Sequence, residues 1–377
     1  GDRPIFKVTF ADGRSTRADA DHLWKVRVNG DWRLRTTGQI ADLINKGGQM
    51  ANQLAIPLCA PMTISPNHEV KLPLHPYVLG ALLGDGHLAN SPGHGRAGEI
   101  RLTSADSALI DRVRARLPAG IGLFLTNENI TFRIGDLSKY GRRTRLIIKD
   151  LRLLGARSHT KFIPSAYLEA NINERWELLQ GLMDTDGTVD KNGGASFCTT
   201  SPMLADNFCD LVRSLGGIAR MALKQTYYTN HGKKHAGRTA YNIGIRFPNP
   251  AKAFTLERKK SRIRPNYQYQ DCLYLNIKSI ERDGNEQASC IMIDHPQRLY
   301  ITDHYIVTHN TWIMTNIIRP LLGNLALLAQ SETTEAGLRQ TLGHDARPVI
   351  FDEAEAEGQR GDSRMANVLA LIRQASS

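Results

Sequence analysis

Residues 78–86 read Val-Leu-Gly-Ala-Leu-Leu-Gly-Asp-Gly, and residues 179–187 read Leu-Gln-Gly-Leu-Met-Asp-Thr-Asp-Gly. Each copy is an apolar run with small residues four positions apart, and each ends in Asp-Gly. A repeat of this kind, about 100 residues apart, predicts two similar half-domains that pack about a pseudo-twofold axis. Small residues let two helix backbones approach closely, so the two runs are expected to form helices that lie side by side.

Such a pair of helices would bring Asp85 and Asp186 together at one end. Two adjacent carboxylates repel each other unless cations lie between them, so the pattern predicts a hard-metal site, most plausibly for Mg²⁺. Metal ions shared by two carboxylates suit in-line cleavage of phosphodiesters. A calcium loop is a poor alternative, because Val189 and Ala195 stand where its glycine and glutamate belong. An incidental aspartate at a helix end is the alternative reading for either copy alone.

The pair of motifs resembles the two motifs of monomeric LAGLIDADG homing endonucleases. Lys161-Phe-Ile-Pro164 resembles the block that supplies this family's active-site lysine, a role that the resemblance carries to Lys161. It also implies an αββαββ half-domain used twice, with strands at 97–103, 121–135, 218–228 and 239–247 forming a saddle on double-stranded DNA. The residues then expected to reach phosphates or base edges are Arg101, Arg133, Lys224, Tyr227, Tyr228, Lys233, Arg238 and Arg246.

Short alternating strands lie on both sides of this region. Residues 4–36 alternate apolar and polar positions around two turn signals, Asp12-Gly13 and Asn29-Gly30, and strands return between residues 273 and 307. The order indicates one all-β module that is split by an α+β insert.

The end of the second β region, Tyr305-Ile-Val-Thr-His309-Asn310-Thr311, resembles the C-terminal splice junction of inteins. An asparagine can cyclise onto its own carbonyl and cut the following peptide bond, so Asn310 would cyclise, His309 would assist and the Thr311 hydroxyl would be the nucleophile. Asp21-His22-Leu-Trp resembles the block whose histidine polarises the upstream scissile bond, and Cys290-Ile-Met-Ile-Asp294 resembles the penultimate block. The resemblance therefore assigns catalytic roles to His22 and Asp294 as well.

Three departures from the intein pattern stand out. Asp19 replaces the threonine usual three residues before the block histidine, and Arg298 replaces a histidine of the penultimate block. No cysteine or serine with the opening block precedes Gly1, so we expect an upstream segment of intein and host to be missing from this chain.

The final segment carries a different pattern. A helix is expected at 312–322, and Pro348-Val-Ile-Phe-Asp352-Glu353 reads as a buried strand ending in two acids, which resembles a Walker B element. Thr311 would complete a phosphate loop, so the segment resembles a phage-type helicase or primase-helicase ATPase.

Composition agrees with a soluble DNA-binding protein. The net charge is +11, with basic runs at 142–145, 233–234 and 258–264, and this favours a polyanionic partner. Five scattered cysteines predict reduced, mostly buried thiols without a zinc site. We expect a cytoplasmic monomer that binds no membrane.

The predicted architecture is multi-domain: an all-β Hint splicing domain interrupted by an α+β endonuclease, followed by a short α/β P-loop fragment. The expected ranges are 1–70 and 268–310 for the splicing domain, 73–265 for the endonuclease and 311–377 for the host fragment. Two alternatives stay open. One is a splicing-only intein with an inactive DNA-binding relic, and the other is a biological role that belongs to the host ATPase.

Overall fold

The chain divides into two compact units: residues 1–286 with 301–308, and residues 287–300 with 309–377. Among the described residues no helix is long and apolar enough to cross a bilayer. The computed structural model describes residues 2–47, 53–63, 71–88, 99–138, 141–230, 232–264, 273–288, 291, 293, 297–310, 319–322, 325, 327–330, 335–342 and 349–352.

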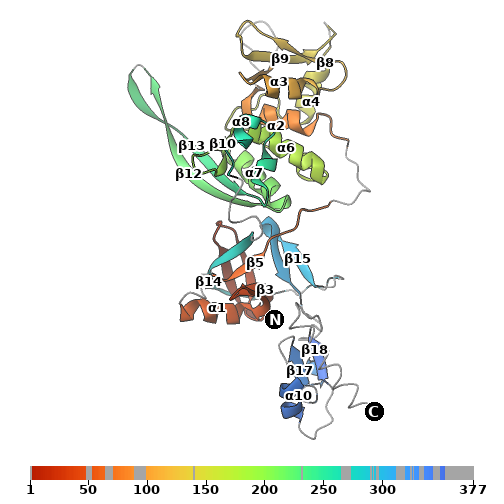
Figure 1. Cartoon of the computed structure of the whole chain (residues 1–377), viewed down its shortest axis with the longest axis vertical. Helices are drawn as coiled ribbons and strands as arrows, with labels where there is room; N and C mark the ends of the chain where they lie inside the picture. Colours follow the sequence, from red (N-terminus) through yellow and green to blue (C-terminus); the bar gives the residue numbers. More distant parts are fainter. Residues whose placement is uncertain are drawn as a thin grey trace. The chain divides into compact units, whose positions relative to one another are not determined.

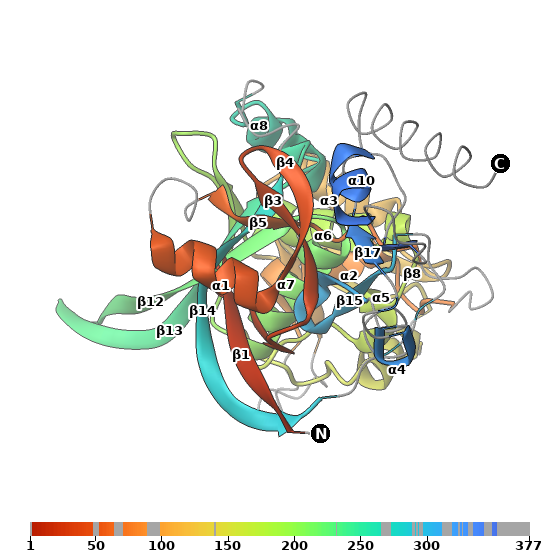
Figure 2. The ribbon, with the colours of Figure 1, turned by 90° about the horizontal axis from the view of Figure 1, so that it is seen from below.

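A six-stranded sheet joins the start of the first unit to a strand that comes after the central region. Its order is β2-β1-β14-β5-β3-β4, and Leu275 of β14 lies opposite Ile56 of β5. Figure 2 shows β1 and β14 running side by side. Strands from both sides of the central region therefore share one sheet, while the domain boundaries remain predictions. The strands are β1 Asp2–Phe10, β2 Ser15–Asp19, β3 Leu23–Val28, β4 Asp31–Thr36, β5 Ala55–Pro57 and β14 Tyr274–Gln287.

The turn signals and apolar positions explain this sheet. Asn29 and Gly30 both have positive φ, 53° and 94°, which a two-residue type I′ hairpin turn requires. Helix α1 (Thr37–Lys46) begins with a capping box between Thr36 and Gln39. The sheet core, with α1 packed on it, consists chiefly of Val8, Phe10, Trp24, Val26, Ile40, Leu54, Ile56, Leu275 and Ile277.

Helices α2 (Pro76–Asp85) and α6 (Ile172–Thr185) pack through the predicted small residues. A Cβ atom at Gly80 would lie only 3.0 Å from the Cα atom of Gly181, and the reverse distance is the same. At Gly84 a Cβ atom would lie 2.6 Å from the Cβ atom of Thr185. The predicted side-by-side helix pair is confirmed, and glycine is required at its closest approach.

Each helix of the pair is followed by a four-stranded sheet. The orders are β6-β7-β9-β8 and β10-β11-β13-β12, so the same arrangement occurs twice along the chain (Figure 1). The first sheet comprises β6 Gly86–His87, β7 Ile100–Thr103, β8 Ile121–Leu125 and β9 Thr131–Asp136. The second comprises β10 Gly187–Val189, β11 Ala195–Thr199, β12 Ile218–Asn230 and β13 Lys233–Arg246.

One continuous core links both sheets to the helices around them. Helices α3 and α7 begin at the side-chain caps Asp106 and Ser201. The remaining helices of this part are α3 Ser107–Arg114, α4 Arg143–Asp150, α5 Ser165–Leu168, α7 Pro202–Ser214, η2 Pro250–Ala253 and α8 Glu257–Lys260.

The last part of the chain follows β15 (Leu299–Thr302), η3 (Asp303–Tyr305) and β16 (Ile306–His309). Tyr305 has a φ of 61° and belongs to the turn that precedes β16. Beyond them, β17 (Leu327–Gln330) and β18 (Val349–Asp352) pair in parallel. The predicted helix at 312–322 is described only as α9 (Arg319–Leu322), and α10 spans Glu335–Leu342.

Candidate functional site

The two aspartates of the repeat lie where the packed helices end. Asp85 is the last residue of α2, and Asp186 is the cap residue directly after α6. Asp85 is exposed and Asp186 is half-buried. Because Gly80 and Gly181 hold the two helices in close contact, both carboxylates occupy the same end of the helix pair.

Electrostatic shifts show that the two carboxylates are near each other. The pKa of Asp186 is raised to about 6, first by burial and then by the charge of Asp85, while Lys161 and Lys259 act in the opposite direction. Desolvation also raises the pKa of Asp85. Burial is the main cause of both shifts, so ionisation of the two carboxylates is costly in the protein alone.

Lys161 lies beside both carboxylates. Its side chain is buried, with 4% exposed, and its Nζ atom donates to four carbonyl oxygens at the end of α2, at 2.8–3.0 Å. The last carbonyls of a helix have no partner within the helix, so the ammonium group satisfies them. Burial lowers the pKa of Lys161 to about 8, against the charges of Asp186 and Asp85. The predicted lysine therefore offers its charge to the site while its protons are held by the backbone.

Lys259 is a counterpart that the sequence analysis missed. Its Nζ atom donates to the carbonyl oxygens of Met183, Asp184, Thr185 and Gly187 at 2.6–3.1 Å, which is the same arrangement at the end of α6. Burial, followed by repulsion from Arg258, lowers its pKa to about 8. The spacing in the sequence could have revealed Lys259, because Lys161 follows Gly86 by 75 residues and Lys259 follows Gly187 by a similar 72.

Asp184, the other acid of the second motif, has a structural role. Its carboxylate accepts hydrogen bonds from the Tyr77 hydroxyl at 2.8 Å and from the Thr255 amide at 2.9 Å, and it is 1% exposed. The described residues contain no cluster of three or more His, Cys, Asp or Glu side chains that could hold a metal. Mg²⁺ is usually held by one or two carboxylates, several waters and substrate phosphates, so the Asp85–Asp186 pair fits such an ion.

The glycines that follow the two aspartates are required by lack of space rather than by an unusual φ. Neither has a positive φ, and Gly86 has extended backbone at −82°. A Cβ atom at Gly86 would lie 2.6 Å from the Cα atom of Leu82, and one at Gly187 would lie 2.7 Å from that of Met183. After each helix the backbone turns back so closely on the last turn of that helix that a side chain has no room at the glycine.

The predicted DNA-contacting residues of the first half already have partners. Arg101 and Arg133 lie directly opposite each other on β7 and β9, and both are half-buried. The Arg101 guanidinium lies 3.0 Å from Glu99 and 3.7 Å from Glu128, and the Arg133 guanidinium lies 4.5 Å from the centre of the Phe124 ring. These contacts reduce the positive charge that this sheet presents.

The second half differs. Lys224, Arg238, Arg246, Tyr227 and Tyr228 are all exposed, as expected of a binding surface. Lys233 lies in β13, but its side chain is outside the described part of the chain.

Cross-strand register adds Arg220, which is exposed and which the sequence analysis missed. Arg220 lies opposite Gly244, four positions along from the Lys224–Ala240 pair, so its side chain shares the face of Lys224. Cys198 lies on this face opposite Asn242 and is also exposed, whereas Cys59 and Cys209 are buried as predicted. The remaining two cysteines lie outside the described residues.

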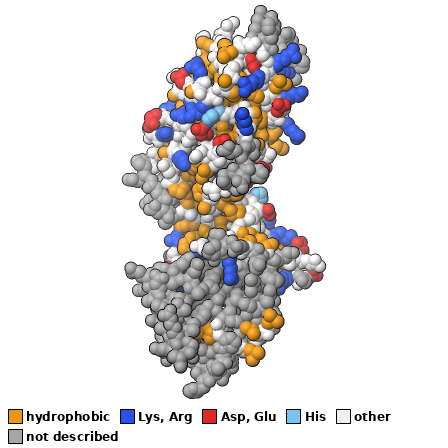
Figure 3. Space-filling model, turned by 90° about the vertical axis from the view of Figure 1, so that its right-hand side faces the viewer, with side chains coloured by type: hydrophobic (Ala, Val, Ile, Leu, Met, Phe, Trp, Pro, Cys, Tyr) orange, Lys and Arg blue, Asp and Glu red, His pale blue; other side chains and the backbone are white. Residues whose placement is uncertain are grey.

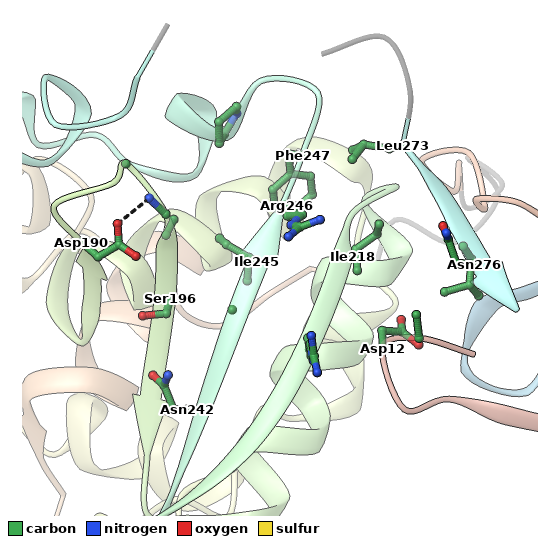
Figure 4. A pocket seen from close by; sticks show the side chains of 18 of the residues that line it. Asp12, Asp190, Ser196, Ile218, Asn242, Ile245, Arg246, Phe247, Leu273 and Asn276 are labelled. Atoms are coloured by element: carbon green, nitrogen blue, oxygen red, sulfur yellow. Dashed lines mark hydrogen bonds between the residues drawn. The ribbon is translucent and has the colours of Figure 1, made fainter. Parts of the chain in front are cut away.

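This face continues into a cavity of about 650 Å³. Figure 4 shows Ser196, Asn242 and Arg246 on one side of it, with Asn276 of β14 and Asp12 on the other. On the side of the molecule seen in Figure 3, Lys and Arg side chains are interspersed with acidic and apolar ones. The cavity itself is lined on the side of the second sheet by polar and basic side chains, among them Arg220 and Arg246.

The predicted splicing residues begin with His22, which lies after β2. Its Nε2 atom is hydrogen-bonded to the Oγ1 atom of Thr308, a buried residue of β16. The backbone carbonyl of His22 accepts a hydrogen bond from the Thr37 amide at 2.9 Å, and its ring packs edge-on against Trp24. The sheet thus holds His22 beside the strand that leads to the predicted junction.

The junction residues His309 and Asn310 are 2% and 5% exposed. The Asn310 amide donates to the carbonyl oxygen of Arg298 at 2.9 Å, and Arg298 has the unusual φ of 49°. Arg298, which departs from the family pattern in its side chain, therefore holds the asparagine through its backbone. Asp294 and Thr311 lie outside the described residues.

Asp19, the other residue that departs from the intein pattern, forms contacts within the turn before β3. Its carboxylate accepts a hydrogen bond from the Asp21 amide at 2.9 Å and lies 3.8 Å from the Arg3 guanidinium. Its backbone carbonyl accepts from the His22 amide at 3.3 Å. Asp19 thus shapes the turn that carries His22.

The chain was compared with known proteins. No family model matches it. The replicative DNA helicase DnaB of Mycobacterium intracellulare is 25% identical over 350 residues, which cover 84% of this chain and 52% of that protein. The protein of the same name from Rhodothermus marinus is 25% identical over 261 residues, which cover 65% of this chain and 25% of that protein. The chain thus spans about half the length of the first relative and a quarter of the second.

Among solved structures, the chain is similar to a variant of I-DmoI in complex with its target DNA in the presence of magnesium. The sequence identity is 17% and the TM-score is 0.31. The similarity covers 48% of this chain and 92% of that one.

Proposed function

We propose that the chain is an intein: a self-splicing domain that carries a LAGLIDADG-type homing endonuclease and is followed by the start of a host ATPase. The observation that carries the nuclease assignment is the convergence of Asp85 and Asp186 at the end of two helices packed through Gly80 and Gly181. The paired lysines and the twofold repetition of helix and sheet order support an αββαββ arrangement with pseudo-twofold symmetry.

In the nuclease reaction, Asp85 and Asp186 would hold the metal, and Lys161 and Lys259 would place positive charge beside them. A bound Mg²⁺ supplies charge stabilisation for phosphodiester hydrolysis. The raised pKa values of both carboxylates favour binding of a cation, because a cation relieves the cost of ionisation. The strands of the two sheets would hold double-stranded DNA across this centre.

In the splicing reaction, the Thr311 hydroxyl would first take over the upstream acyl group. The side-chain amide nitrogen of Asn310 would then attack its own backbone carbonyl carbon, forming a succinimide and breaking the bond to Thr311, whose nitrogen gains a proton. His309 would assist by moving that proton, and Asp294 would coordinate the steps. His22 would act on the upstream bond, and its hydrogen bond with Thr308, the residue before His309 in the sequence, supports a role for His22 in splicing.

The host is proposed to be a helicase-type ATPase. The parallel β17–β18 pair, which ends at Asp352, is consistent with the core of such a protein. Both relatives are named as replicative helicases, but only 67 residues of this chain follow Asn310. A match of 350 residues therefore extends far into the region before the junction, which supports the proposal that the helicase named there is the host of a shared insertion.

The main competing function is a splicing domain with a nuclease that has lost its activity. The presence of Asp85, Asp186 and two capping lysines favours the active enzyme. The test is to incubate the full chain and Mg²⁺ with a plasmid that carries the uninterrupted host gene. Linear product supports an active nuclease, whereas intact plasmid at saturating protein would establish the inactive relic.

Two variants separate the proposed activities. Asp186→Asn is expected to abolish DNA cleavage while the 67-residue fragment after Asn310 is still released. Asn310→Ala is expected to block that release while DNA cleavage continues. Loss of both activities in either variant would contradict the proposed division between the two sites.

A further inference from the structure

The two DNA-facing sheets differ in length and charge. In the second sheet, β11 pairs with β13 only over residues 241–245, yet the β12–β13 pairing runs on to Asn230 and Lys233. Residues 224–240 therefore form a two-stranded ribbon that extends beyond the sheet, and Figures 1 and 2 both show it projecting. In the first sheet, β8 and β9 end together at the Leu125–Phe132 pair, so no ribbon projects there.

The charges follow the same asymmetry. Residues 218–247 contain six Lys or Arg residues and no Asp or Glu. The corresponding first-half segment, residues 121–136, contains one Arg, one Glu and one Asp. Neutralisation of phosphates by Lys and Arg dominates the affinity of proteins for DNA, so the second of these two segments is expected to contribute more than the first.

The ribbon has no packing role that would explain its length. Lys224, Tyr227, Tyr228, Lys234 and Arg238 are all exposed, and an isolated two-stranded ribbon stabilises a fold very little. Its aromatic rings are nevertheless ordered by the ribbon itself. The Lys234 ammonium lies 4.3 Å from the centre of the Tyr227 ring, and the Tyr228 ring stacks on His235 at 5.4 Å.

We propose that this ribbon, residues 224–240, binds the DNA flank on the second-half side, so that the target is held asymmetrically. The inference rests on the proposed nuclease function. Seven residues from Lys224 to Asn230, at about 3.3 Å each, span roughly 23 Å. At about 3.4 Å per base pair, this corresponds to roughly seven base pairs beyond the reach of the first half. A two-stranded ribbon of this width fits the major groove.

The test measures binding of the full chain carrying Asp186→Asn, so that DNA stays intact, to duplexes of the uninterrupted host gene centred on the insertion point. Seven base pairs are removed from one end or from the other. Removal on one side is expected to weaken binding at least tenfold, while removal on the opposite side changes it less than threefold. Equal losses from both ends would overturn the proposal.

A second variant assigns the loss to the ribbon. Changing Lys224, Lys234 and Arg238 to Gln should lower affinity at least tenfold at 0.1 M salt and reduce the log–log salt slope by about 2.7, at about 0.9 per phosphate. In this variant, trimming the sensitive flank should have no further effect. The matched control changes three exposed residues elsewhere, Lys149, Arg152 and Arg157, to Gln, and should alter affinity less than threefold.

The possible outcomes distinguish failure of the ribbon proposal from failure of the proposed nuclease function. A ribbon variant that remains as sensitive to trimming as the parent would overturn the role of the ribbon, as would equal binding of a single-stranded RNA of the same length. A parent chain that binds none of the duplexes would instead refute the proposed nuclease function. A shortened chain with a two-residue turn in place of residues 225–239 checks the result, and thermal unfolding shows that the variant is folded.

Discussion

The Nε2 atom of His22 is hydrogen-bonded to the hydroxyl of Thr308, although 286 positions separate the two residues in the sequence. His22 follows the second strand of the chain, and Thr308 immediately precedes the predicted junction His309-Asn310. The contact exists because β14 and Ile306 return to the N-terminal strands after the central region. This hydrogen bond joins His22, which is proposed to act on the upstream scissile bond, to β16, the strand that leads to the downstream junction.

Thr308→Val is expected to slow splicing of a full-length precursor by about tenfold, since a hydrogen bond of about 1.4 kcal/mol orients the imidazole. Thr308→Ser keeps the hydroxyl and should restore most of the rate. The measurement is the rate of product formation as a function of pH, because loss of the partner should also shift the profile. Equal rates for the Val and Ser variants, with an unchanged profile, would mean that Thr308 is only a packing residue.

Gly181→Ala tests the helix contact. The added Cβ atom would lie 3.0 Å from the Cα atom of Gly80 and closer still to the carbonyl oxygen of Tyr77, so α2 and α6 must separate. We expect the free energy of unfolding to fall by about 1–3 kcal/mol. DNA cleavage should fall by roughly 100-fold, because the displacement separates Asp85 from Asp186.

Gly38→Ala is the matched control for this prediction. Its Cβ atom would meet only ordinary contacts at 3.5 Å or more, so stability and cleavage should remain close to those of the parent. Wild-type cleavage by Gly181→Ala would show that the carboxylates do not depend on the helix contact.

Lys259→Met tests the lysine that the sequence analysis missed. Loss of the ammonium removes the donor group shared by four carbonyl oxygens at and just after the end of α6, which costs about 1–3 kcal/mol. It also removes positive charge beside Asp186, so cleavage should fall roughly 100-fold, as in Lys161→Met. The half-buried neighbour Lys260, changed to Met, serves as the control. If Lys259→Met cleaves normally and Lys161→Met does not, the two lysines are not equivalent.

The sequence predicted most of what depends on local pattern. The spacing of Gly80 and Gly181 predicted the helix pair, and Asn29-Gly30 predicted a turn that the structure confirms through two positive φ values. Lys259 was not predicted, because a side chain that caps a distant helix produces no periodic pattern in the sequence. It was instead grouped with the basic run around it. Its exposed neighbour Arg258 shows why such a run is ambiguous.

The full length of the ribbon was not predicted, for a similar reason. Strands were expected at 218–228 and 239–247, whereas β12 and β13 continue to Asn230 and from Lys233. Residues near the tip are polar on both faces, so no alternation of apolar side chains marks them as a strand. The thiols were predicted to be mostly buried, and Cys198 is an exposed exception because β11 turns that residue toward the open face, opposite Asn242.

Asp186→Asn should stabilise the metal-free protein while it removes DNA cleavage. The folded-state pKa of Asp186 is about 6, above its ordinary value of 3.8, so the folded protein binds a proton more tightly than the unfolded chain. The free energy of unfolding therefore falls as pH rises from about 4 to about 6, and the shift of about two units corresponds to roughly 3 kcal/mol.

The substitution removes this penalty, so Asp186→Asn should be more stable than the parent by up to about 3 kcal/mol at pH 7 and about equal at pH 4. Urea unfolding in chelator at both pH values measures the difference. Mg²⁺ competes with the proton for the same carboxylate, so it should raise the unfolding temperature of the parent more at pH 7 than at pH 5, and should leave that of Asp186→Asn almost unchanged. If Mg²⁺ stabilised both proteins equally at pH 7, the cation would be bound elsewhere and Asp186 would not be its ligand.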